Sequence, residues 1–242
     1  MSQLVIRDVE YFHEQERLLG YFCAPGTNQG QTLPGILLVH GAAGINQQMM
    51  DCSQRLAAFG YAVLALDLWG ERQQLRGPEQ IGAILGRFAS DRTLWMQRFS
   101  AGHQALRAQT SVDSTRLGAV GYCFGGTTVL EAIRCGIPLQ GVVSLHGGLD
   151  LVGDDWSAAS RAAQALICTG ADDVMAKADD LQRVQQALSA ADIRWQTELF
   201  SHTRHAFTEP DHPHTPPFAA YNSRADRRSW QTMQAFFTEL FL

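Results

Sequence analysis

The sequence lacks the features that mark membrane, secreted and disulfide-stapled proteins. None of its apolar runs approaches the roughly 20 residues that span a bilayer, so we expect no membrane partner. The N-terminal residues mix acidic side chains and arginines with apolar ones, unlike a secretory leader. The five cysteines, an odd number without a Cys-x-x-Cys pair, argue against a disulfide framework. They favour a reducing compartment, which we expect to be the cytoplasm.

The sequence also has no excess of basic over acidic residues. The 19 lysines and arginines and the 24 acidic residues give a net charge of -5, which argues against nucleic acid as a partner. A hydrophobic fraction of 45% and a charged fraction of 18% are ordinary for a globular protein. No composition break or internal repeat indicates a second domain, so we expect a single domain over residues 1–242. The sequence leaves the oligomeric state open.

Strand and helix patterns alternate along the chain. Alternating apolar residues predict an opening β-hairpin over residues 5–12 and 18–24. Further strands are predicted at 35–39, 62–68, 117–120, 142–145, 165–168 and 195–200. Helices are predicted at 49–59, 127–133, 179–190 and 223–240, and a long helical region over 77–109. Apolar strands that alternate with helices indicate a largely parallel sheet with helices on both faces. In such a sheet the ligand site lies beyond the carboxyl ends of the strands.

The run Gly121-Tyr122-Cys123-Phe124-Gly125-Gly126 joins a predicted strand to a predicted helix. In the G-x-S-x-G elbow, glycines flank a nucleophile on a sharp turn, because a Cβ at those positions would collide. Here a thiol takes the place of the hydroxyl. Most free cysteines are small buried hydrophobes, a role that we expect for Cys52, Cys135 and Cys168. That role requires no flanking glycines, so Cys123 is predicted to be a nucleophile.

An acid and a base follow the elbow in the chain order of α/β-hydrolases, which is nucleophile, acid, histidine. Asp172 and Asp173 follow one predicted strand, and His202 and His205 follow the last one. A carboxylate that orients the imidazole and stabilises its charged form belongs on a loop just beyond its strand. These residues can therefore converge with the thiol at one edge of the sheet.

Four blocks of the chain together resemble the dienelactone hydrolase family, the carboxymethylenebutenolidases and their relatives. The blocks are HGAAGIN at 40–46, GYCFGG at 121–126, GADD at 170–173 and RHAF at 204–207. The resemblance extends from the opening hairpin to the final helix and implies an α/β-hydrolase fold, with Cys123 as nucleophile and His205 as base. Its Gly-x-x-Asp spacing implies Asp173 as the acid, with Asp172 as the competitor. His202 is expected to be a solvent-exposed loop residue.

One feature of the best-known family members is absent from this chain. They carry a glutamate in the segment that aligns with His40 and Gly41, where it helps to control the thiol, and this chain has no acidic residue there. Either another group activates Cys123 or His205 alone forms the thiolate–imidazolium pair. Whether dienelactone itself is a substrate therefore stays open.

The oxyanion of a tetrahedral intermediate needs two hydrogen-bond donors. We expect one to be the amide of Phe124, which follows the nucleophile at the positive end of a helix. The other is expected from the loop after the strand at 35–39, with Ala42 as the candidate and Ala43 as the alternative. His40 precedes a glycine in this loop, and we expect it to be structural.

Candidate substrate contacts are less specific. The segment that contains Trp69 and Arg72 follows a strand end, so both are candidates for substrate binding, although such a loop could equally cap the sheet. Arg72, Arg76 and Arg87 could each pair with a substrate carboxylate, but most surface arginines have no such role.

Sulfur at the nucleophile position restricts the substrate. A thiolate is a strong nucleophile and a good leaving group, with a reference pKa of about 8.5. An alkoxide leaves the intermediate less readily than sulfur does, whereas an enol or a phenol leaves readily. We therefore expect a hydrolase of activated esters or enol-lactones that forms a thioester on Cys123, with a small-molecule substrate and no cofactor. A general carboxylesterase or thioesterase of the same fold is the alternative.

Two other classes of protein compete with this hypothesis. His202 and His205 could form a metal site with Asp211, His212 and His214, because histidine and carboxylate bind zinc. Prolines make this stretch an irregular loop without the ligand spacing of zinc motifs, so we expect no metal. A ligand receptor that keeps the fold without catalysis is the other alternative, and a degenerate triad would favour it.

Overall fold

The computed structural model describes residues 3–26, 30–210 and 215–242. The chain divides into two compact units, Met1–Ala119 and Val120–Leu242.

The first unit begins with the predicted hairpin. Strand β1 (Leu4–His13) pairs antiparallel with β2 (Glu16–Pro25), in a register that runs from Leu4 opposite Pro25 to His13 opposite Glu16. Strand β2 also pairs antiparallel with β4 (Ala62–Leu66), and β4 pairs in parallel with β3 (Leu33–Val39). The last five residues of β3 and all of β4 are buried, as their uninterrupted apolar runs predict.

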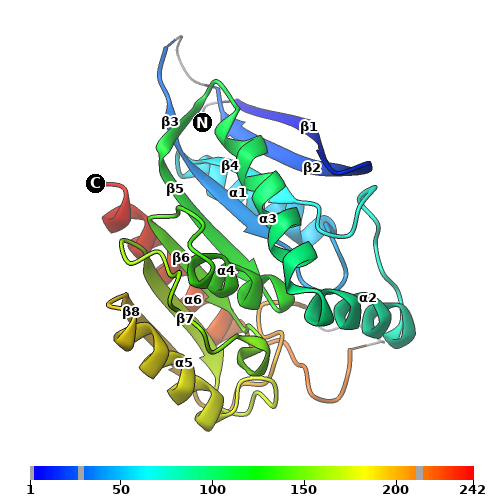
Figure 1. The fold of residues 1–242 in the computed structure, drawn as a ribbon, viewed down its shortest axis with the longest axis vertical. Helices are drawn as coiled ribbons and strands as arrows, with labels where there is room; N and C mark the ends of the chain where they lie inside the picture. Colours follow the sequence, from blue (N-terminus) through cyan, green and yellow to red (C-terminus); the bar gives the residue numbers. More distant parts are fainter. Residues whose placement is uncertain (1–2, 27–29, 211–214) are drawn as a thin grey trace. The chain divides into compact units, whose positions relative to one another are not determined.

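Two helices of the first unit pack on its strands. Helix α1 (Gln47–Ala58) contacts β2 and β4, and α3 (Arg92–Arg107) contacts β1, β3 and β4. In Figure 1, α3 lies in front of these strands and α1 behind them. The side chain of Asn46 accepts a hydrogen bond from the amide of Met49 and so caps the start of α1.

The long helical region predicted over residues 77–109 is divided into two helices, a break that the sequence did not predict. The structure has two helices here, α2 (Pro78–Ser90) and α3, separated at Asp91. Asp91 has φ -117° and ψ 79°, outside the helical region, and its carboxylate accepts from the amide of Leu94 at 2.9 Å. The apolar pattern continues across this residue because both helices bury apolar side chains, so periodicity alone does not reveal the break. The aspartate is the N-cap of a second helix.

Strand β5 (Val112–Tyr122) carries the chain from the first unit into the second. The second unit then consists, in chain order, of α4 (Phe124–Arg134), β6 (Gly141–Leu145), a 3₁₀ turn at Leu149–Leu151, β7 (Gln164–Gly170), α5 (Ala178–Ala190), β8 (Arg194–Phe200) and α6 (Ser223–Leu240). Strand β7 pairs in parallel with both β6 and β8. Helix α4 contacts β6, α5 contacts β8, and α6 contacts β6 and β7. In Figure 1, α4 and α5 lie in front of the strands of this unit and α6 behind them.

The strands are ordered β1-β2-β4-β3-β5-β6-β7-β8 in an eight-stranded sheet. This order, with the antiparallel hairpin at its start and parallel pairs after it, confirms the predicted mostly parallel sheet. Strand β8 differs from the expected run of buried strands, since each of its residues is partly or fully exposed. Its place at the end of the strand order explains this exposure, because an edge strand has one neighbour instead of two.

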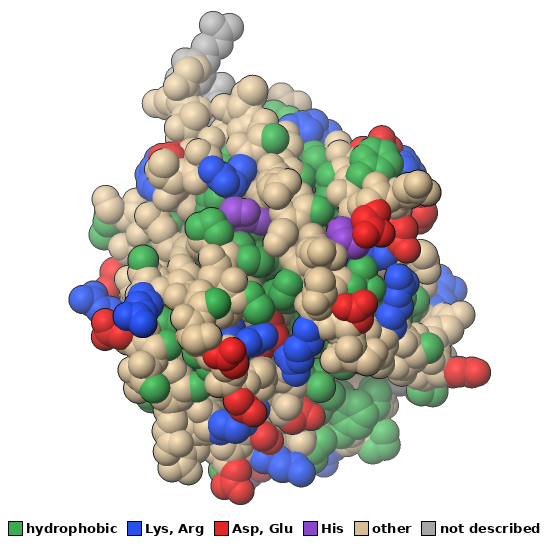
Figure 2. Space-filling view, viewed as in Figure 1, with side chains coloured by type: hydrophobic (Ala, Val, Ile, Leu, Met, Phe, Trp, Pro, Cys, Tyr) green, Lys and Arg blue, Asp and Glu red, His purple; other side chains and the backbone are tan. Residues whose placement is uncertain are grey.

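The surface carries charges of both signs. Figure 2 shows acidic and basic side chains interspersed on the face that it presents. Among the described residues, no helix has the length and hydropathy that crossing a bilayer requires.

Candidate active site

The sharp turn between β5 and α4 places Cys123 in an unusual backbone conformation. Its φ is 53° and its ψ is -118°, and its amide donates to the carbonyl of Leu145 at 3.0 Å. A Cβ on Gly121 would lie 1.9 Å from the carbonyl oxygen of Gly125, and a Cβ on Gly126 would meet backbone atoms at 2.9 Å. The glycines are therefore required by close packing, while the residue at the tip has a left-handed φ.

Cys123, His205 and Asp173 form a line of contacts in the second unit. The Sγ atom of Cys123 lies 3.1 Å from Nε2 of His205, and Nδ1 of His205 lies 2.9 Å from Oδ2 of Asp173. The other carboxylate oxygen of Asp173 accepts from the amide of Met175 at 2.9 Å. Asp173 is 3% exposed and His205 2% exposed, whereas Cys123 is partly exposed. A carboxylate thus orients an imidazole whose far nitrogen faces an accessible sulfur.

The two sequence neighbours that competed for these positions lie elsewhere. The side chain of Asp172 is exposed, and its amide donates to the carbonyl of Thr203 at 3.0 Å. The side chain of His202 is also exposed, on the turn that follows β8. The structure therefore brings Asp173 and His205 to the thiol and leaves Asp172 and His202 at the surface.

The surroundings of His205 favour its charged form. Burial disfavours the imidazolium, but the charge on Cys123 and the hydrogen bonds with Asp173 and Cys123 outweigh burial. Together they raise the pKa of His205 well above its ordinary value of 6.5. A charged His205 would donate from Nε2 toward the sulfur of Cys123, which lies 3.1 Å away.

A second buried histidine, His146, lies beside this line and was not among the predicted site residues. Its Nδ1 shares the amide proton of Cys123 with the carbonyl of Leu145, at 3.1 Å from the amide nitrogen, and its Nε2 lies 2.8 Å from Oγ1 of Thr208. Its ring centroid is 5.4 Å from that of His205, with the ring planes at 73°. Burial, and then the charge of His205, lower the pKa of His146 well below 6.5, so this ring is neutral. Its place directly after β6 is the sequence signal that could have identified it.

Glu209 is another group near the base that the sequence did not reveal. Burial raises the pKa of its carboxyl group, and interaction with His205 acts in the opposite direction. Its amide donates to the carbonyl of Ala206 at 2.9 Å, which folds this part of the loop into a turn. No motif in the sequence distinguishes Glu209 from an ordinary loop glutamate.

In the first unit, the residues after β3 form a compact loop. Nδ1 of the buried His40 contacts the carbonyl oxygen of Gly41 at 2.7 Å, and Nε2 accepts from the amide of Leu68 at 3.2 Å. Burial lowers the pKa of His40. The indole of Trp69 is buried, and its Nε1 donates to the carbonyl of Ala42 at 3.1 Å. These contacts support a structural role for His40, while substrate binding by Trp69 and the amide of Ala42 as an oxyanion donor stay predictions.

The guanidinium of Arg72 is engaged within the first unit. It donates to the carbonyls of Leu19 and Gly20 at 3.0 and 2.8 Å and pairs with Asp8 at 2.7 Å. The amide of Arg72 donates to the buried carboxylate of Asp67 at 2.7 Å. These contacts fix the loop after β4 to the hairpin, and substrate binding by Arg72 stays a prediction.

The competing metal site falls partly outside the described residues, because Asp211, His212 and His214 do. Within the part of the chain that is described, no group of three or more histidine, cysteine or acidic side chains could hold a metal ion.

The other cysteines differ from the elbow cysteine in their surroundings. Cys23, Cys52 and Cys168 are buried, and burial raises the pKa of the Cys23 thiol to about 11. The expectation that Cys135 is buried is wrong: it is exposed at the C-cap of α4, where Arg134 donates to its sulfur at 3.3 Å. The helix ends at this residue, which places its side chain at the surface.

Comparison with known proteins gives a consistent result over nearly the whole chain. The model of the family described as "Dienelactone hydrolase family" matches residues 20–241. A protein of Yersinia pestis named "Putative carboxymethylenebutenolidase" is 23% identical over 236 residues, covering 93% of this chain and 84% of the relative.

Two solved structures are similar over their full lengths. One is a dienelactone hydrolase-like promiscuous phosphotriesterase from metagenomic libraries, with a TM-score of 0.92, 31% identity and 99% of both chains covered. The other is a protein named m3DLH, with a TM-score of 0.89, 29% identity and 99% of both chains covered.

Proposed function

This chain belongs to the dienelactone hydrolase family and is a hydrolase of ester or lactone bonds, and we propose that it cleaves activated esters and enol-lactones through a thioester on Cys123. The observation that carries the proposal is the line of contacts from Asp173 through His205 to the sulfur. These contacts support Cys123 as the nucleophile, His205 as the base and Asp173 as the orienting acid of an acyl transfer.

In the acylation step, the thiolate attacks the carbonyl carbon, and the carbonyl π electrons move to oxygen. When the tetrahedral intermediate collapses, the carbon–oxygen bond to the leaving group breaks and the carbon–sulfur bond remains. The leaving oxygen takes the proton from Nε2 of His205, which lies 3.1 Å from the sulfur. Asp173 accepts from Nδ1 and stabilises the imidazolium before this transfer.

Deacylation uses the same groups in the reverse sense. Neutral His205 accepts a proton from water through Nε2 while the water oxygen attacks the thioester carbon. Collapse of the second intermediate breaks the carbon–sulfur bond and releases the carboxylic acid, and the thiolate–imidazolium pair is restored.

Backbone amides would stabilise the oxyanion in both steps. The amide of Phe124 belongs to the first turn of α4, at the positive end of the helix dipole. Ala42, on the loop after β3, is our candidate for the second donor. Removal of one such donor typically costs roughly a hundredfold to a thousandfold in kcat.

The leaving group decides which substrates react. A tetrahedral intermediate with sulfur on one side and an alkoxide on the other tends to expel sulfur and to return the substrate. An enolate or phenolate leaves more readily than an alkoxide, so collapse goes forward. We therefore propose enol-lactones and aryl esters ahead of alkyl esters, and we expect amides not to react.

Two exposed apolar side chains, one beside the base and one next to Asp173 in the sequence, support a substrate with a planar or apolar portion. The ring centroid of Phe218 lies 6.1 Å from that of His205, and Phe218 is 42% exposed. Val174, which directly follows Asp173, is 55% exposed. A ring packed against Phe218 would exclude water next to the acyl carbon.

Two relatives indicate which substrates to test. A protein of Bradyrhizobium named as a probable 2-oxo-3-(5-oxofuran-2-ylidene)propanoate lactonase is 31% identical over 104 residues, 42% of this chain. Its named substrate is an enol-lactone. The relative named as a promiscuous phosphotriesterase adds phosphotriesters to the panel.

The test is a comparison of kcat/KM for an enol-lactone, p-nitrophenyl acetate, ethyl acetate, an acyl thioester and a phosphotriester. We expect the first two to exceed ethyl acetate by at least a hundredfold and Cys123→Ala to lose all of these activities while remaining folded. Equal rates on alkyl and aryl esters would favour a general carboxylesterase, and a preference for the acyl thioester would favour a thioesterase. Undiminished turnover by Cys123→Ala would refute the nucleophile.

None of the five cysteines, all of which lie in the described part of the chain, forms a disulfide, which supports our expectation of a reducing compartment such as the cytoplasm. The partner that the site requires is a small-molecule ester or lactone.

A further inference from the structure

We propose that His146 is a positioning residue that holds the backbone of the nucleophile and the loop of the base at a fixed separation. The inference rests on the proposed role of Cys123 as nucleophile. Its observational basis is a bridge of two hydrogen bonds, from the Cys123 amide to the imidazole and from the imidazole to Thr208.

The donors and acceptors around His146 determine its tautomer. A backbone amide can only donate, so Nδ1, which lies 3.1 Å from the amide of Cys123, must be the unprotonated nitrogen. The proton of the neutral ring then resides on Nε2 and is donated to Oγ1 of Thr208 at 2.8 Å. The ring joins two segments through one donor and one acceptor, and both functions require that it be neutral.

The backbone of His146 has a conformation that residues other than glycine rarely adopt. Its φ is 40°, in the left-handed region, and its amide donates to the carbonyl of Cys168 at 2.9 Å. The next residue, Gly147, packs so closely on Gly126 of α4 that a Cβ on Gly126 would lie 2.9 Å from its Cα. A strained backbone conformation of this kind persists only where the surrounding structure imposes it, and such conformations are frequent at functional sites.

Thr208 lies on the loop that carries the base. It is buried and follows His205 by three residues, so the bridge ties this loop to the turn that presents the sulfur. Without it, the 3.1 Å contact between Sγ and Nε2 would depend on the loop and on the hydrogen bond between His205 and Asp173. A displacement of about 1 Å at reacting atoms can cost roughly a hundredfold in rate.

A protonated ring at position 146 would disrupt the same geometry. Nδ1 would then carry a proton that faces the amide proton of Cys123, which places two donors against each other. The cation would also lie beside His205, whose ring centroid is 5.4 Å away and which is itself charged in the resting pair. A neutral imidazole is therefore the form that fits beside the ion pair.

Substitutions at Thr208 can distinguish the effect of losing the hydrogen bond to His146 from the effect of altered packing. Thr208→Val keeps the shape and removes the acceptor for Nε2, whereas Thr208→Ser keeps a hydroxyl and loses only a methyl group. We expect Thr208→Val to lower kcat/KM about tenfold and Thr208→Ser to stay within about twofold. His146→Asn, which keeps an acceptor near the position of Nδ1, should lose less activity than His146→Ala.

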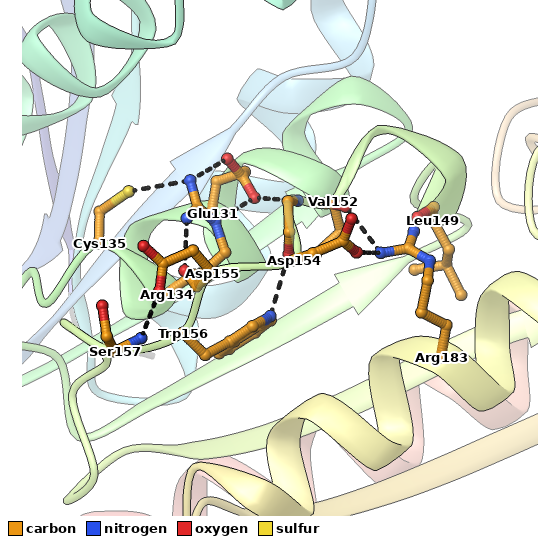
Figure 3. A network of polar contacts seen from close by, with 11 residues as sticks. Glu131, Arg134, Cys135, Leu149, Val152, Asp154, Asp155, Trp156, Ser157 and Arg183 are labelled. Atoms are coloured by element: carbon orange, nitrogen blue, oxygen red, sulfur yellow. Dashed lines mark hydrogen bonds and ion pairs between the residues drawn. The ribbon is translucent and has the colours of Figure 1, made fainter.

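Arg183 in the same unit provides a control variant that should lose stability while keeping the hydrogen bonds of His146. Arg183 donates to the carbonyls of Leu149 and Val152 and pairs with Asp154, so it holds the segment that follows β6 (Figure 3). This arginine has no contact with Cys123 or His205 among the described interactions. Arg183→Met should lower the melting temperature without changing the reactivity of Cys123.

The readout is the rate of alkylation of Cys123 by iodoacetamide at pH 6, followed by peptide mapping, with the exposed Cys135 as internal reference. Wild-type protein and Thr208→Ser should react at Cys123 at least tenfold faster than at Cys135, and Thr208→Val several-fold more slowly than wild type at Cys123. Equal rates for Thr208→Val and Thr208→Ser, or an equal loss in Arg183→Met, would overturn the bridge. If wild-type Cys123 reacted no faster than Cys135, the proposed function itself would fail.

Discussion

Two buried histidines in the second unit, His205 and His146, contact the same cysteine and are held in opposite states of charge. His205 faces the sulfur of Cys123 and a carboxylate, and its pKa is raised. His146 faces the amide of Cys123 and a hydroxyl, and its pKa is lowered. Burial acts in the same direction on both rings, so the difference comes from their partners.

His205 can transfer a proton during the reaction, whereas His146 keeps its proton and holds neighbouring segments in place. Partners that bear negative charge stabilise an imidazolium, which can later release its proton to a leaving group. Neutral partners do not counteract burial, which lowers the pKa of the ring, so the ring stays neutral and can bridge two segments by hydrogen bonds.

The largest effect is expected when the carboxylate of Asp173 is removed. Asp173→Asn should lower kcat by roughly a thousandfold to ten-thousandfold, because the imidazolium loses its partner and the ring can adopt the wrong tautomer. The matched control, Asp172→Asn, alters an exposed carboxylate one residue away and should stay within about twofold. Steady-state kinetics on p-nitrophenyl acetate measures both variants, and the opposite ranking would make Asp172 the acid.

The charge states of the two rings can be read directly by NMR titration of labelled histidine. In wild type, His205 should remain protonated well above pH 6.5, and His146 should remain neutral down to well below it. Cys123→Ala removes the first cause that raises the pKa of His205, so its pKa should fall while His146 stays neutral. A His205 that titrates near 6.5 in wild type would remove the distinction between the rings.

The pH dependence of stability should follow from the same shifts. A histidine whose pKa is lowered by folding contributes stability that is present above pH 6.5 and lost as the pH falls, and this applies to His146 and His40. Between pH 6.5 and 5, the free energy of unfolding should fall by up to about 1.4 kcal/mol per pH unit for each of them. Urea titrations should show a shallower slope for His146→Asn than for wild type.

His205 should contribute with the opposite sign. Its raised pKa stabilises the fold fully below pH 6.5, and this contribution is lost as the pH rises through its folded value. Because His205 is protonated in both the folded and the unfolded state well below pH 6.5, it does not mask the loss due to the other two. An unfolding free energy that does not change between pH 6.5 and 5 would contradict the lowered pKa values.

The smallest effect concerns the strained tip of the elbow. Cys123 has a φ of 53°, which glycine adopts without cost. Cys123→Gly should therefore be inactive and more stable to urea than Cys123→Ala, by about 1 kcal/mol. Equal or lower stability of the glycine variant would show that the turn is not strained at this residue.

Much of the fold and the core of the site could be predicted from the sequence. Any such turn packs so closely that the glycines around Cys123 are required. The motif can therefore be recognised from the sequence alone. The mostly parallel sheet follows from apolar strands that alternate with helices. The break at Asp91 was missed because a capping aspartate leaves the apolar pattern intact on both sides.

The role of His146 could not be predicted, for a physical reason. It depends on a positive φ, on the register that brings Leu145 beside Cys123, and on a loop that returns Thr208 to the ring. The register and the returning loop are long-range properties without a local pattern in the sequence, so the place of His146 after β6 indicates only that it lies near the site. The exposure of Cys135 has a similar origin, because it depends on where α4 ends.

The most direct test of the central claim is to trap the acyl-enzyme. The protein is mixed with excess p-nitrophenyl acetate, quenched with acid before one turnover is complete, digested and analysed by mass spectrometry. We predict an acetyl group on the peptide that contains Cys123, which disappears after longer incubation and never forms in Cys123→Ala. Acetylation of another residue, or turnover without any acetylated peptide at position 123, would contradict the thioester mechanism.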